Sequence, residues 1–347
     1  MSTYSKIMAT PDAKNTLASM RIFTTFANAN SEVGAFPLTV PVTVLDRRNG
    51  LRNLITRYIN SKPNDLFVFN GEVSLITAAC LIKLCSPVQR GKIVAVDMVL
   101  RVPKTAKARL AAWVRSRLWT QVDQYIHYFK DLRGFSHHYG IDAAKSDYVP
   151  FKANLFEEAN ARKDKISLAE GDYIFSAGRS LRDYQTLIEA ARINGLPTAL
   201  LFTSQSDWAA HGTKLDLDNL PSNVRLIADT GGKQGWLEVL QGARLVVVPT
   251  LPESICASGI GTYLDAMALG KPVIITRGPG ADDVLTDTQA RFVAPSDPEA
   301  LAQAMRQLWD NHHAATTLAK NGRQYALGLG DEQALLSRIF SKALNSA

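Results

Sequence analysis

Cysteine is scarce in this 347-residue chain, and long apolar runs are missing from it. The three cysteines, Cys80, Cys85 and Cys256, suit neither a disulfide framework nor the paired spacings of a zinc site, which favours a reducing compartment. No apolar run reaches the roughly 20 residues that span a bilayer, and the polar N-terminus lacks the layout of a signal peptide. We therefore expect a protein that is neither exported nor integral to a membrane.

Acidic residues are sparse in the first half only. Residues 1–168 hold 24 Lys and Arg against 13 Asp and Glu, a net charge of +11, whereas residues 169–347 hold 15 against 19, a net charge of −4. The basic half favours an anionic partner, and phospholipid headgroups, a lipid-linked pyrophosphate and nucleic acid would all fit its charge. No recognised nucleic-acid-binding module accompanies the charge, so we expect no nucleic acid partner.

Low-complexity segments are also missing, and 46% hydrophobic with 20% charged residues are the proportions of a folded protein. The length suits two domains, which implies a cleft. The polar stretch at residues 156–167 breaks the periodicity and is the best linker candidate. We therefore place the two domains at residues 1–165 and 166–330.

The second half alternates strands and helices at βαβ spacing, which predicts a doubly wound α/β domain. Its apolar runs predict strands at residues 172–177, 197–203, 224–227, 243–249 and 272–276. Its helical periodicity predicts helices at residues 183–193, 233–240 and 261–269. The first half indicates a smaller α/β domain, with a helix at residues 74–84 and strands at residues 20–25, 40–45, 66–70, 92–99 and 124–129.

Residues 246–276 run from a strand through a loop into a glycine-rich helix start and then into a second strand. Ser258, Gly259 and Gly261 stand where the helix begins, and the free N–H groups of a helix N-terminus bind phosphate. Asp265 lies one turn deeper on the same face, where its carboxylate could accept hydrogen bonds from sugar hydroxyls. Phosphate and ribose together indicate a nucleotide, although the same residues are equally typical of tight strand–helix packing.

A second strand-to-helix loop, within residues 174–190, holds Gly178, Arg179 and Arg182. Ligands bind beyond the carboxyl ends of the strands in a doubly wound sheet, so both loops can open on one crevice. Arginine suits a diphosphate because its planar fork makes paired, charge-assisted hydrogen bonds. Solvated surface arginines beside Asp183 would give the same sequence.

Three segments in this order, SAGRSLRDYQTLIEA, VVVPT and SGIGTYLDAMALGKPVIIT, resemble the C-terminal donor domain of GT-B glycosyltransferases, especially glycosyltransferase family 4. The resemblance covers residues 170–330 and implies two Rossmann-like doubly wound α/β domains that face a cleft. It also implies that a C-terminal helix within residues 331–347 packs back on the N-terminal, acceptor-side domain. The implied activity is Leloir-type transfer of a sugar from a nucleotide-diphosphate sugar to a lipid-linked or glycan acceptor.

The resemblance also assigns roles by position. Arg179 and Arg182 match the basic pair that binds the donor diphosphate, and Asp265 matches the acidic residue that holds the ribose hydroxyls. The loop that approaches phosphate and sugar matches Gly259, Ile260, Gly261 and Thr262. Ala257 departs from the family, which has there the first glutamate of a paired motif. Glu253 lies nearby but out of register, so the transferred sugar and the stereochemical outcome stay open.

Such enzymes offset the charge of the leaving diphosphate with arginines and helix N-termini, so the resemblance implies neither a metal nor another cofactor. It implies a cytoplasmic enzyme of surface polysaccharide or glycoconjugate synthesis, peripheral on the inner face of the membrane. Ala257 supports an alternative, a catalytically silent GT-B module that binds a nucleotide or a partner subunit.

An inverting reaction would need a general base on the acceptor side. Glu72 and Asp97 are candidates, because each lies at or near the end of a predicted strand of the first half. Either carboxylate would equally suit a local cap or ion pair. His127, His137 and His138 are further candidates, since histidine acts as a base near neutrality.

Residues 101–119 hold six basic residues, two tryptophans and no acid. On a helix Leu110, Trp113, Val114 and Leu118 share a face, although Lys107 and Arg117 intrude on it. The segment predicts an interfacial helix that contacts an anionic membrane surface. A solvated helix that docks on its own domain through the tryptophans is the alternative.

Overall fold

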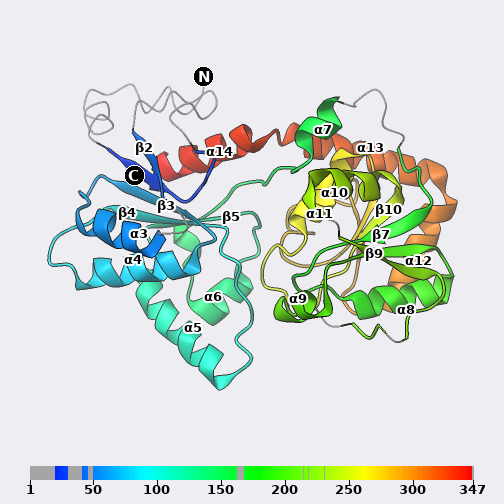
Figure 1. Ribbon diagram of the computed structural model, residues 1–347, viewed down its shortest axis with the longest axis horizontal. Coiled ribbons are helices and arrows are strands. Elements are labelled where there is room, and N and C mark those ends of the chain that lie inside the picture. The colour runs from blue at the N-terminus through cyan, green and yellow to red at the C-terminus, as the bar shows by residue number, and fades with distance from the viewer. Residues whose placement is uncertain are drawn as a thin grey trace. The chain divides into compact units, whose positions relative to one another are not determined.

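The computed structural model describes residues 20–29, 41–45, 50–161, 168–213, 215–217, 219–229 and 231–345. The chain forms two compact units, each built on one sheet of parallel strands (Figure 1). The first unit comprises Met1–Tyr128, Leu132–Val149 and Gln333–Ala347, and the second comprises Phe129–Asp131 and Pro150–Glu332.

The sheet of the first unit has the strand order β2-β1-β3-β4-β5-β6. Its strands are β1 Ile22–Thr24, β2 Val42–Val44, β3 Leu66–Asn70, β4 Lys92–Val96, β5 Gln124–His127 and β6 Ser146–Tyr148. Its helices are α3 Gly50–Ile59, α4 Val73–Cys85, α5 Ala106–Leu118, α6 Arg133–Tyr139 and α14 Glu332–Asn345, with short 3₁₀ turns η2 Trp119–Gln121 and η3 Ala143–Lys145. Strands β3 and β4 are almost wholly buried, as apolar strands covered on both faces should be.

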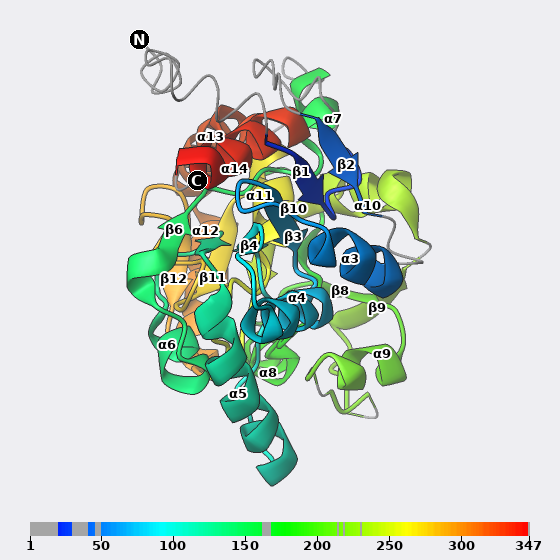
Figure 2. The ribbon, with the colours of Figure 1, turned by 90° about the vertical axis from the view of Figure 1, so that its left-hand side faces the viewer.

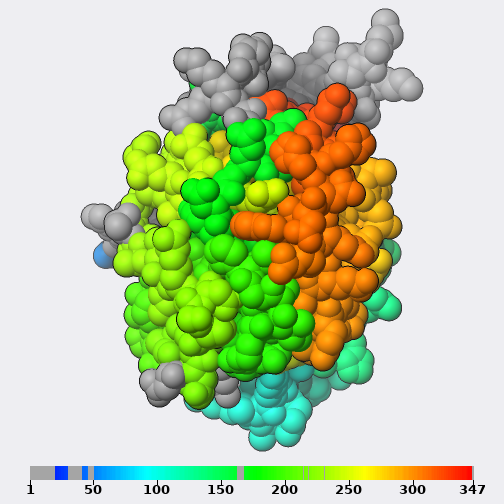
Figure 3. All heavy atoms as spheres, turned by 90° about the vertical axis from the view of Figure 1, so that its right-hand side faces the viewer, coloured from blue at the N-terminus to red at the C-terminus, as the bar shows by residue number. Residues whose placement is uncertain are grey.

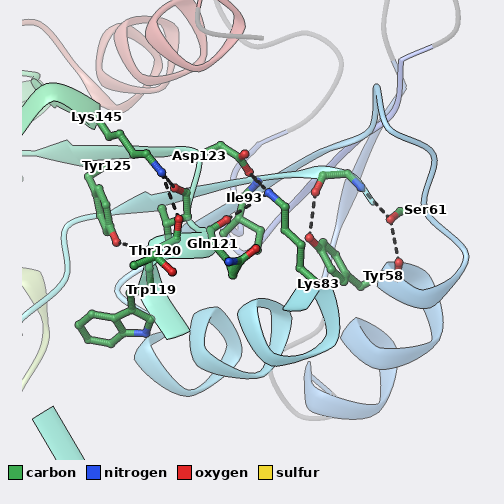
Figure 4. Close-up of polar contacts among 12 residues, drawn as sticks. Tyr58, Ser61, Lys83, Ile93, Trp119, Thr120, Gln121, Asp123, Tyr125 and Lys145 are labelled. Carbon is green, nitrogen blue, oxygen red and sulfur yellow. Dashed lines mark hydrogen bonds and ion pairs between the residues drawn. The ribbon is translucent and has the colours of Figure 1, made fainter. Parts of the chain in front are cut away.

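A polar network ties the amino-terminal edge of this sheet together (Figure 4). Asp123 Oδ2 accepts hydrogen bonds from the Ile93 N–H and from Lys83 Nζ, each at 2.6 Å. Lys145 Nζ donates to the carbonyl of Thr120 at 3.1 Å. These side chains join loops and strands at one edge, so the network serves the fold, and ligand chemistry is to be sought at the opposite, carboxyl edge.

The sheet of the second unit has the order β12-β11-β10-β7-β8-β9. Its strands are β7 Tyr173–Ser176, β8 Thr198–Phe202, β9 Val224–Ala228, β10 Ala243–Val248, β11 Val273–Thr276 and β12 Arg291–Val293. The chain runs outward from β7 to β9 and then restarts beside β7 at β10, which is the 3-2-1-4-5-6 order of a dinucleotide-binding fold. The strand order therefore reverses between β7 and β10. Both sheets confirm the predicted pair of doubly wound α/β domains.

The helices of the second unit cover both faces of its sheet. They are α7 Phe156–Ala161, α8 Tyr184–Asn194, α9 Gln205–Ala210, α10 Gly232–Gln241, α11 Ile260–Ala268, α12 Pro298–Asp310 and α13 His312–Gly328. Phe175 and Val246 point into one buried cluster, whereas their neighbours Ile174 and Leu245 point into the other. Helices α8 and α12 pack together over the second cluster, and their green and orange surfaces meet in Figure 3.

The boundary between the units differs from the predicted one at residues 165 and 166. It falls between Val149 and Pro150, so residues 150–161 belong to the second unit. Part of the predicted linker forms α7, in which Ala159 is buried and Phe156 packs against the core. A helix of six residues is too short to show a clear period in the sequence, which explains the error.

Helix α14 returns the end of the chain to the first unit. Its Phe340 ring lies 6.4 Å from that of Phe26, and Lys342 Nζ pairs with Asp147 at 2.8 Å. Gln124 also donates to the Lys342 carbonyl at 3.2 Å. Among the helices described, none is both long and apolar enough to cross a bilayer.

Candidate functional site

A pocket of about 470 Å³ opens at the carboxyl edge of the second sheet, beside the point where the strand order reverses. It is lined from the ends of β7, β8 and β9, from α10 and from the first turns of α11. The lining residues are Asn154, Ala177, Gly178, Arg179, Leu201, Thr203, Trp208, Asp229, Trp236, Gly261, Thr262 and Asp265. Five of the predicted donor-binding residues therefore meet in one pocket: Gly178, Arg179, Gly261, Thr262 and Asp265.

Helix α11 presents its N-terminus to this pocket. Gly259 precedes the helix with φ +96°, a left-handed conformation that suits glycine. The N–H groups of the first turn have no partner within the helix, so Gly261 and Thr262 bring free donors and a partial positive charge to the pocket wall. An anion is the ligand that such a wall stabilises.

Arg182 lies beneath this wall rather than in it. The residue is only 3% exposed, and Nε donates to the Ala177 carbonyl at 3.0 Å. A Cβ added at Gly178 or Gly259 would lie 2.4 or 2.9 Å from Arg182 Nη2, so both glycines are needed to admit the guanidinium. Burial lowers the pKa of Arg182, and among the residues described no carboxylate pairs with it. Its positive charge therefore lies uncompensated under the loops at Gly178 and Gly259.

Arg179 is the arginine that reaches the pocket. Its side chain is 58% exposed, and its Nη1 lies 3.4 Å from Asp207 Oδ1. Exposed ion pairs of this length contribute little to stability, so the guanidinium can turn to an anionic ligand at small cost. The two predicted arginines thus differ in position: one lines the pocket and the other underlies it.

Asp265 lines the pocket but already has partners. Its carboxylate accepts hydrogen bonds from the Leu155 N–H at 2.9 Å, from Trp236 Nε1 at 2.9 Å and from Asn154 Nδ2 at 3.4 Å. Burial raises its pKa, and these hydrogen bonds oppose that rise. The Asn154 backbone adds a fourth hydrogen bond. A carboxylate has about four acceptor positions, so a ligand hydroxyl would have to share or replace one of these partners. Sequence reasoning missed Asn154, Leu155 and Trp236, for which no motif gave a signal.

The remaining predicted donor residues do not line this pocket. Ser258 lines a separate cavity of about 40 Å³, where its Oγ lies 2.9 Å from Ser254 Oγ. Glu253 lies in the preceding loop, partly buried, and Ile260 packs on the hydrophobic core. Gly280 approaches Ala257 so closely that a Cβ at 280 would lie 2.4 Å from the Ala257 Cβ. The backbone at 280 therefore covers the position at which the family has its glutamate.

Asp97 and Glu72 lie on adjacent strand ends of the first sheet. Asp97 follows β4 directly in a left-handed conformation, φ +48°, which is strained for a residue other than glycine. Burial raises the pKa of its carboxyl group to about 6. Glu72 precedes α4 without capping it, and the Gly71 N–H binds the Val96 carbonyl at 2.8 Å. The structure thus brings both candidate carboxylates to one edge.

The histidine candidates have different surroundings. His127 ends β5 and is 1% exposed, between the rings of Tyr125 and Phe135. Burial lowers its pKa to about 4, so it is neutral at pH 7. His137 and His138 lie on α6 with their ring centroids 4.6 Å apart. Within the residues described, no cluster of three or more His, Cys, Asp or Glu could hold a metal ion.

Helix α5 exposes an apolar strip beside its basic residues. Leu110, Trp113 and Val114 are 62%, 57% and 42% exposed, and only Ala112 of this helix is buried. Trp119, just beyond the helix, is buried and stacks on Tyr139 at 5.7 Å. Figure 2 shows α5 extending away from the rest of the first unit. One of the two tryptophans therefore docks on the domain, and the other faces solvent.

Comparison with known proteins relates part of the chain to one family. Residues 181–311 match the family described as glycosyl transferases group 1. No curated protein matches the sequence. Among solved structures the chain is similar to HepE of Anabaena in complex with UDP and glucose, with a TM-score of 0.60 at 16% identity over 94% of this chain and 92% of that one.

Two further solved structures agree. Sucrose-phosphate synthase from Thermosynechococcus elongatus gives a TM-score of 0.61 at 18% identity, over 94% of this chain and 89% of that one. The UDP-forming trehalose-phosphate synthase from Burkholderia xenovorans gives a TM-score of 0.58 at 12% identity, over 86% of this chain and 78% of that one. The two units thus have the GT-B fold of sugar-transferring enzymes. The family match lies within the second unit, and together with this fold it indicates a glycosyltransferase.

Proposed function

We propose that this glycosyltransferase takes its sugar from a nucleotide-diphosphate sugar held in the pocket of the second unit. The observation that carries the proposal is the pocket itself, in which a helix N-terminus, Arg179 and an underlying buried cation surround one space at the reversal point of the sheet. The HepE structure is in complex with UDP and glucose, which supports a sugar nucleotide as the donor.

The diphosphate would lie against the first turn of α11, within reach of Arg179, with Arg182 adding positive charge from below. Asp265 would accept a ribose hydroxyl in place of its longest hydrogen bond, the one from Asn154 Nδ2 at 3.4 Å. In the reaction the bond from C1 of the sugar to the diphosphate breaks, and the acceptor oxygen bonds to C1 as its proton leaves. Donors fixed at the leaving oxygens stabilise the charge that develops on them.

Transfer without a metal is part of the proposal. Arg179 and the α11 N-terminus would offset the charge of the leaving diphosphate in place of a divalent cation. The triplet at residues 216–218 has DxD spacing, and its Asp216 is bound by Asn219 and does not line the pocket. Activity that survives EDTA supports the metal-free mechanism, whereas activity restored only by Mg²⁺ or Mn²⁺ contradicts it.

For an inverting reaction, which needs a general base on the acceptor side, we assign that base to Asp97. Its strained position at a strand end and its raised pKa suit a group that takes a proton from an acceptor hydroxyl near neutral pH. Glu72 on the neighbouring strand end is the second candidate.

The proposed acceptor is lipid-linked or a saccharide, and the proposed role is surface polysaccharide or glycoconjugate synthesis at the cytoplasmic face of a membrane. Helix α5 supports this setting, because exposed Leu110 and Trp113 stand among Lys104, Lys107 and Arg109. A tryptophan among basic residues suits the headgroup region of an anionic bilayer.

The alternative, a silent module that binds a nucleotide without transfer, is favoured by one observation. Ala257 lacks the carboxylate of the family motif, and Gly280 closes over that position. Sugar-nucleotide turnover in the presence of acceptor separates an enzyme from such a module.

The test of the donor site is thermal stability against UDP, GDP, ADP, TDP and their common sugar conjugates, with EDTA present. A ligand at about 100 times its Kd adds roughly 2.7 kcal/mol to the stability of the folded state. We expect a shift for one base in the wild type, lost in Arg179→Ala. Arg192→Ala is the matched control, because Arg192 is also an exposed arginine paired with a carboxylate, Glu189, and does not line the pocket. No shift with any nucleotide would contradict the proposal.

A further inference from the structure

The pocket has opposite charge at its two ends. One end holds Arg179 and the N-terminus of α11. The other end holds Asp229, which directly follows β9, two strands away from β7 in the sheet. Two strand spacings correspond to about 10 Å. An extended ligand that is anionic at one end would therefore present its other end to a carboxylate.

The Asp229 carboxylate has a defined orientation. Its Oδ1 accepts the Gly231 N–H at 2.9 Å, and its own N–H continues the sheet ladder to the Phe202 carbonyl at 2.9 Å. Within the part of the chain that the structure describes, no cation forms an ion pair with Asp229, although the residue is exposed. Leu201, on the strand between β7 and β9, and Trp236 supply apolar surface to the pocket. A flat ring that lies on this surface would meet the carboxylate with its edge.

A carboxylate only accepts hydrogen bonds, so it selects a ring edge with donors. Guanine offers two adjacent donors, N1–H and N2–H, which match the two oxygens of a carboxylate. Uracil and thymine offer one N–H between two carbonyls that repel the carboxylate, and adenine offers one amino group beside an acceptor nitrogen. Hydrogen bonds to an ionised group are about twice as strong as neutral ones, so the difference is large enough to select a base.

We propose that the donor is a guanosine-diphosphate sugar and that Asp229 selects the base by accepting hydrogen bonds from the guanine N1–H and N2–H. This inference rests on the proposed function, because it places the diphosphate of the same nucleotide at the α11 end. The contact proposed above between Asp265 and the ribose is unchanged.

Isothermal titration of GDP, UDP and ADP, with EDTA present, tests the assignment on the wild type, Asp229→Asn and Asp172→Asn. Asparagine keeps the turn to Gly231, because it retains one side-chain oxygen, but its amide donor opposes the guanine amino group. Asp172 is an exposed aspartate at the amino end of β7 and serves as the control.

We expect GDP to bind the wild type at least about tenfold more tightly than UDP or ADP, which corresponds to the loss of one charge-assisted hydrogen bond. Asp229→Asn should lower GDP affinity about tenfold or more and leave UDP affinity within about threefold, whereas Asp172→Asn should change neither. UDP preference in the wild type, or a GDP preference that survives in Asp229→Asn, would overturn the assignment while the nucleotide site stands. Binding of no nucleotide at all would overturn the proposed function together with it.

Discussion

The two units differ in the side chains at the carboxyl edges of their sheets, and in each unit some of these side chains oppose the net charge of the unit. The first unit holds 21 Lys and Arg against 9 Asp and Glu, net +12, yet its strand ends bear Glu72 and Asp97. The second holds 18 against 23, net −5, yet the end of β7 bears Arg179 and, beneath it, Arg182, while Asp229 follows β9. Site charge is thus set by a few residues at strand ends, and net charge reports on the outer surface.

The glycines follow the same division. In the second unit Gly178 and Gly259 admit a buried guanidinium under the proposed phosphate end, whereas in the first unit Gly71 and Asp97 both take left-handed conformations beside the proposed base. A donor site needs close backbone approach to phosphate, and a base needs a side chain that is held rigidly. Four predictions test this comparison, in order of expected effect.

Removing the carboxylate of the proposed base, Asp97, should have the largest effect. Asp97→Asn should lower kcat/KM by about 10²- to 10⁴-fold without weakening donor binding, because the substitution touches only the acceptor side. In the wild type, kcat/KM should rise with pH through about 6, the raised pKa of Asp97. Steady-state kinetics over pH 5–8 measures both, with Asp142→Asn as a control that retains its turn cap. An unchanged pH profile in Asp97→Asn would exclude Asp97 as the base.

The buried histidine should make the first unit sensitive to acid. The pKa of His127 is about 4 in the folded protein and 6.5 ordinarily. Between these pH values the imidazole is therefore protonated in the unfolded chain and neutral in the folded protein. The free energy of unfolding should therefore rise with pH between about 4 and 6.5, by roughly 3 kcal/mol. Asp97 has the opposite effect, because its raised pKa of about 6 means that the folded protein holds this proton more tightly than the unfolded chain does. Its contribution to the free energy of unfolding should fall as the pH rises from 3.8 to 6.

His127→Phe, which keeps an aromatic ring between Tyr125 and Phe135, should remove the rise that His127 contributes. Urea unfolding at pH 4.5 and pH 7 measures it. If the free energy of unfolding changed equally between pH 4.5 and pH 7 in the wild type and in His127→Phe, His127 would not control acid sensitivity.

Filling the floor of the donor site should harm both stability and binding. A Cβ at Gly259 would lie 2.5 Å from Val248 Cγ1, so Gly259→Ala should cost about 1–3 kcal/mol of stability in addition to the roughly 1 kcal/mol of a left-handed alanine. Gly195→Ala is the matched control, because Gly195 has φ +69° and no atom within 4 Å of an added Cβ. Nucleotide binding should weaken in Gly259→Ala alone. Equal losses in both variants would mean that close packing at Gly259 is unimportant.

A substitution on the exposed strip of helix α5 should have the smallest effect. Trp113→Ala should weaken cosedimentation with anionic liposomes at low salt by about tenfold, since a half-exposed tryptophan inserts part of its apolar area. Leu84→Ala, an equally exposed apolar residue on α4, should leave it unchanged. Failure of the wild type to sediment with such vesicles would contradict the proposed contact of α5 with a membrane.

The sequence predicted the second unit well because its strands are continuous apolar runs and its loops fall at strand ends. Residues 173–176, 198–202 and 243–248 are strands within predicted ranges, and Gly178, Arg179 and Gly261 lie where the topological rule places a ligand. The same rule applied to the ends of β8 and β9 would have found Thr203 and Asp229, which were missed.

Other features depend on contacts between distant parts of the chain. The Leu155 N–H reaches Asp265 across 110 residues, and no local pattern signals such a contact. Whether an arginine in a loop lies in the pocket, as Arg179 does, or under it, as Arg182 does, depends on how the glycines pack. Strand β6 was missed because its three residues, Ser-Asp-Tyr, are only partly buried at the sheet edge and carry no apolar run.

The most direct test of the donor site is hydrogen exchange of the whole protein with and without saturating GDP, in EDTA. The account predicts slower exchange at residues 177–182 and 259–265, where the backbone meets the diphosphate, and no change at residues 70–72 or 97–100 of the first unit. Protection at the strand ends of the first unit without protection at residues 259–265 would contradict the division of roles between the two units.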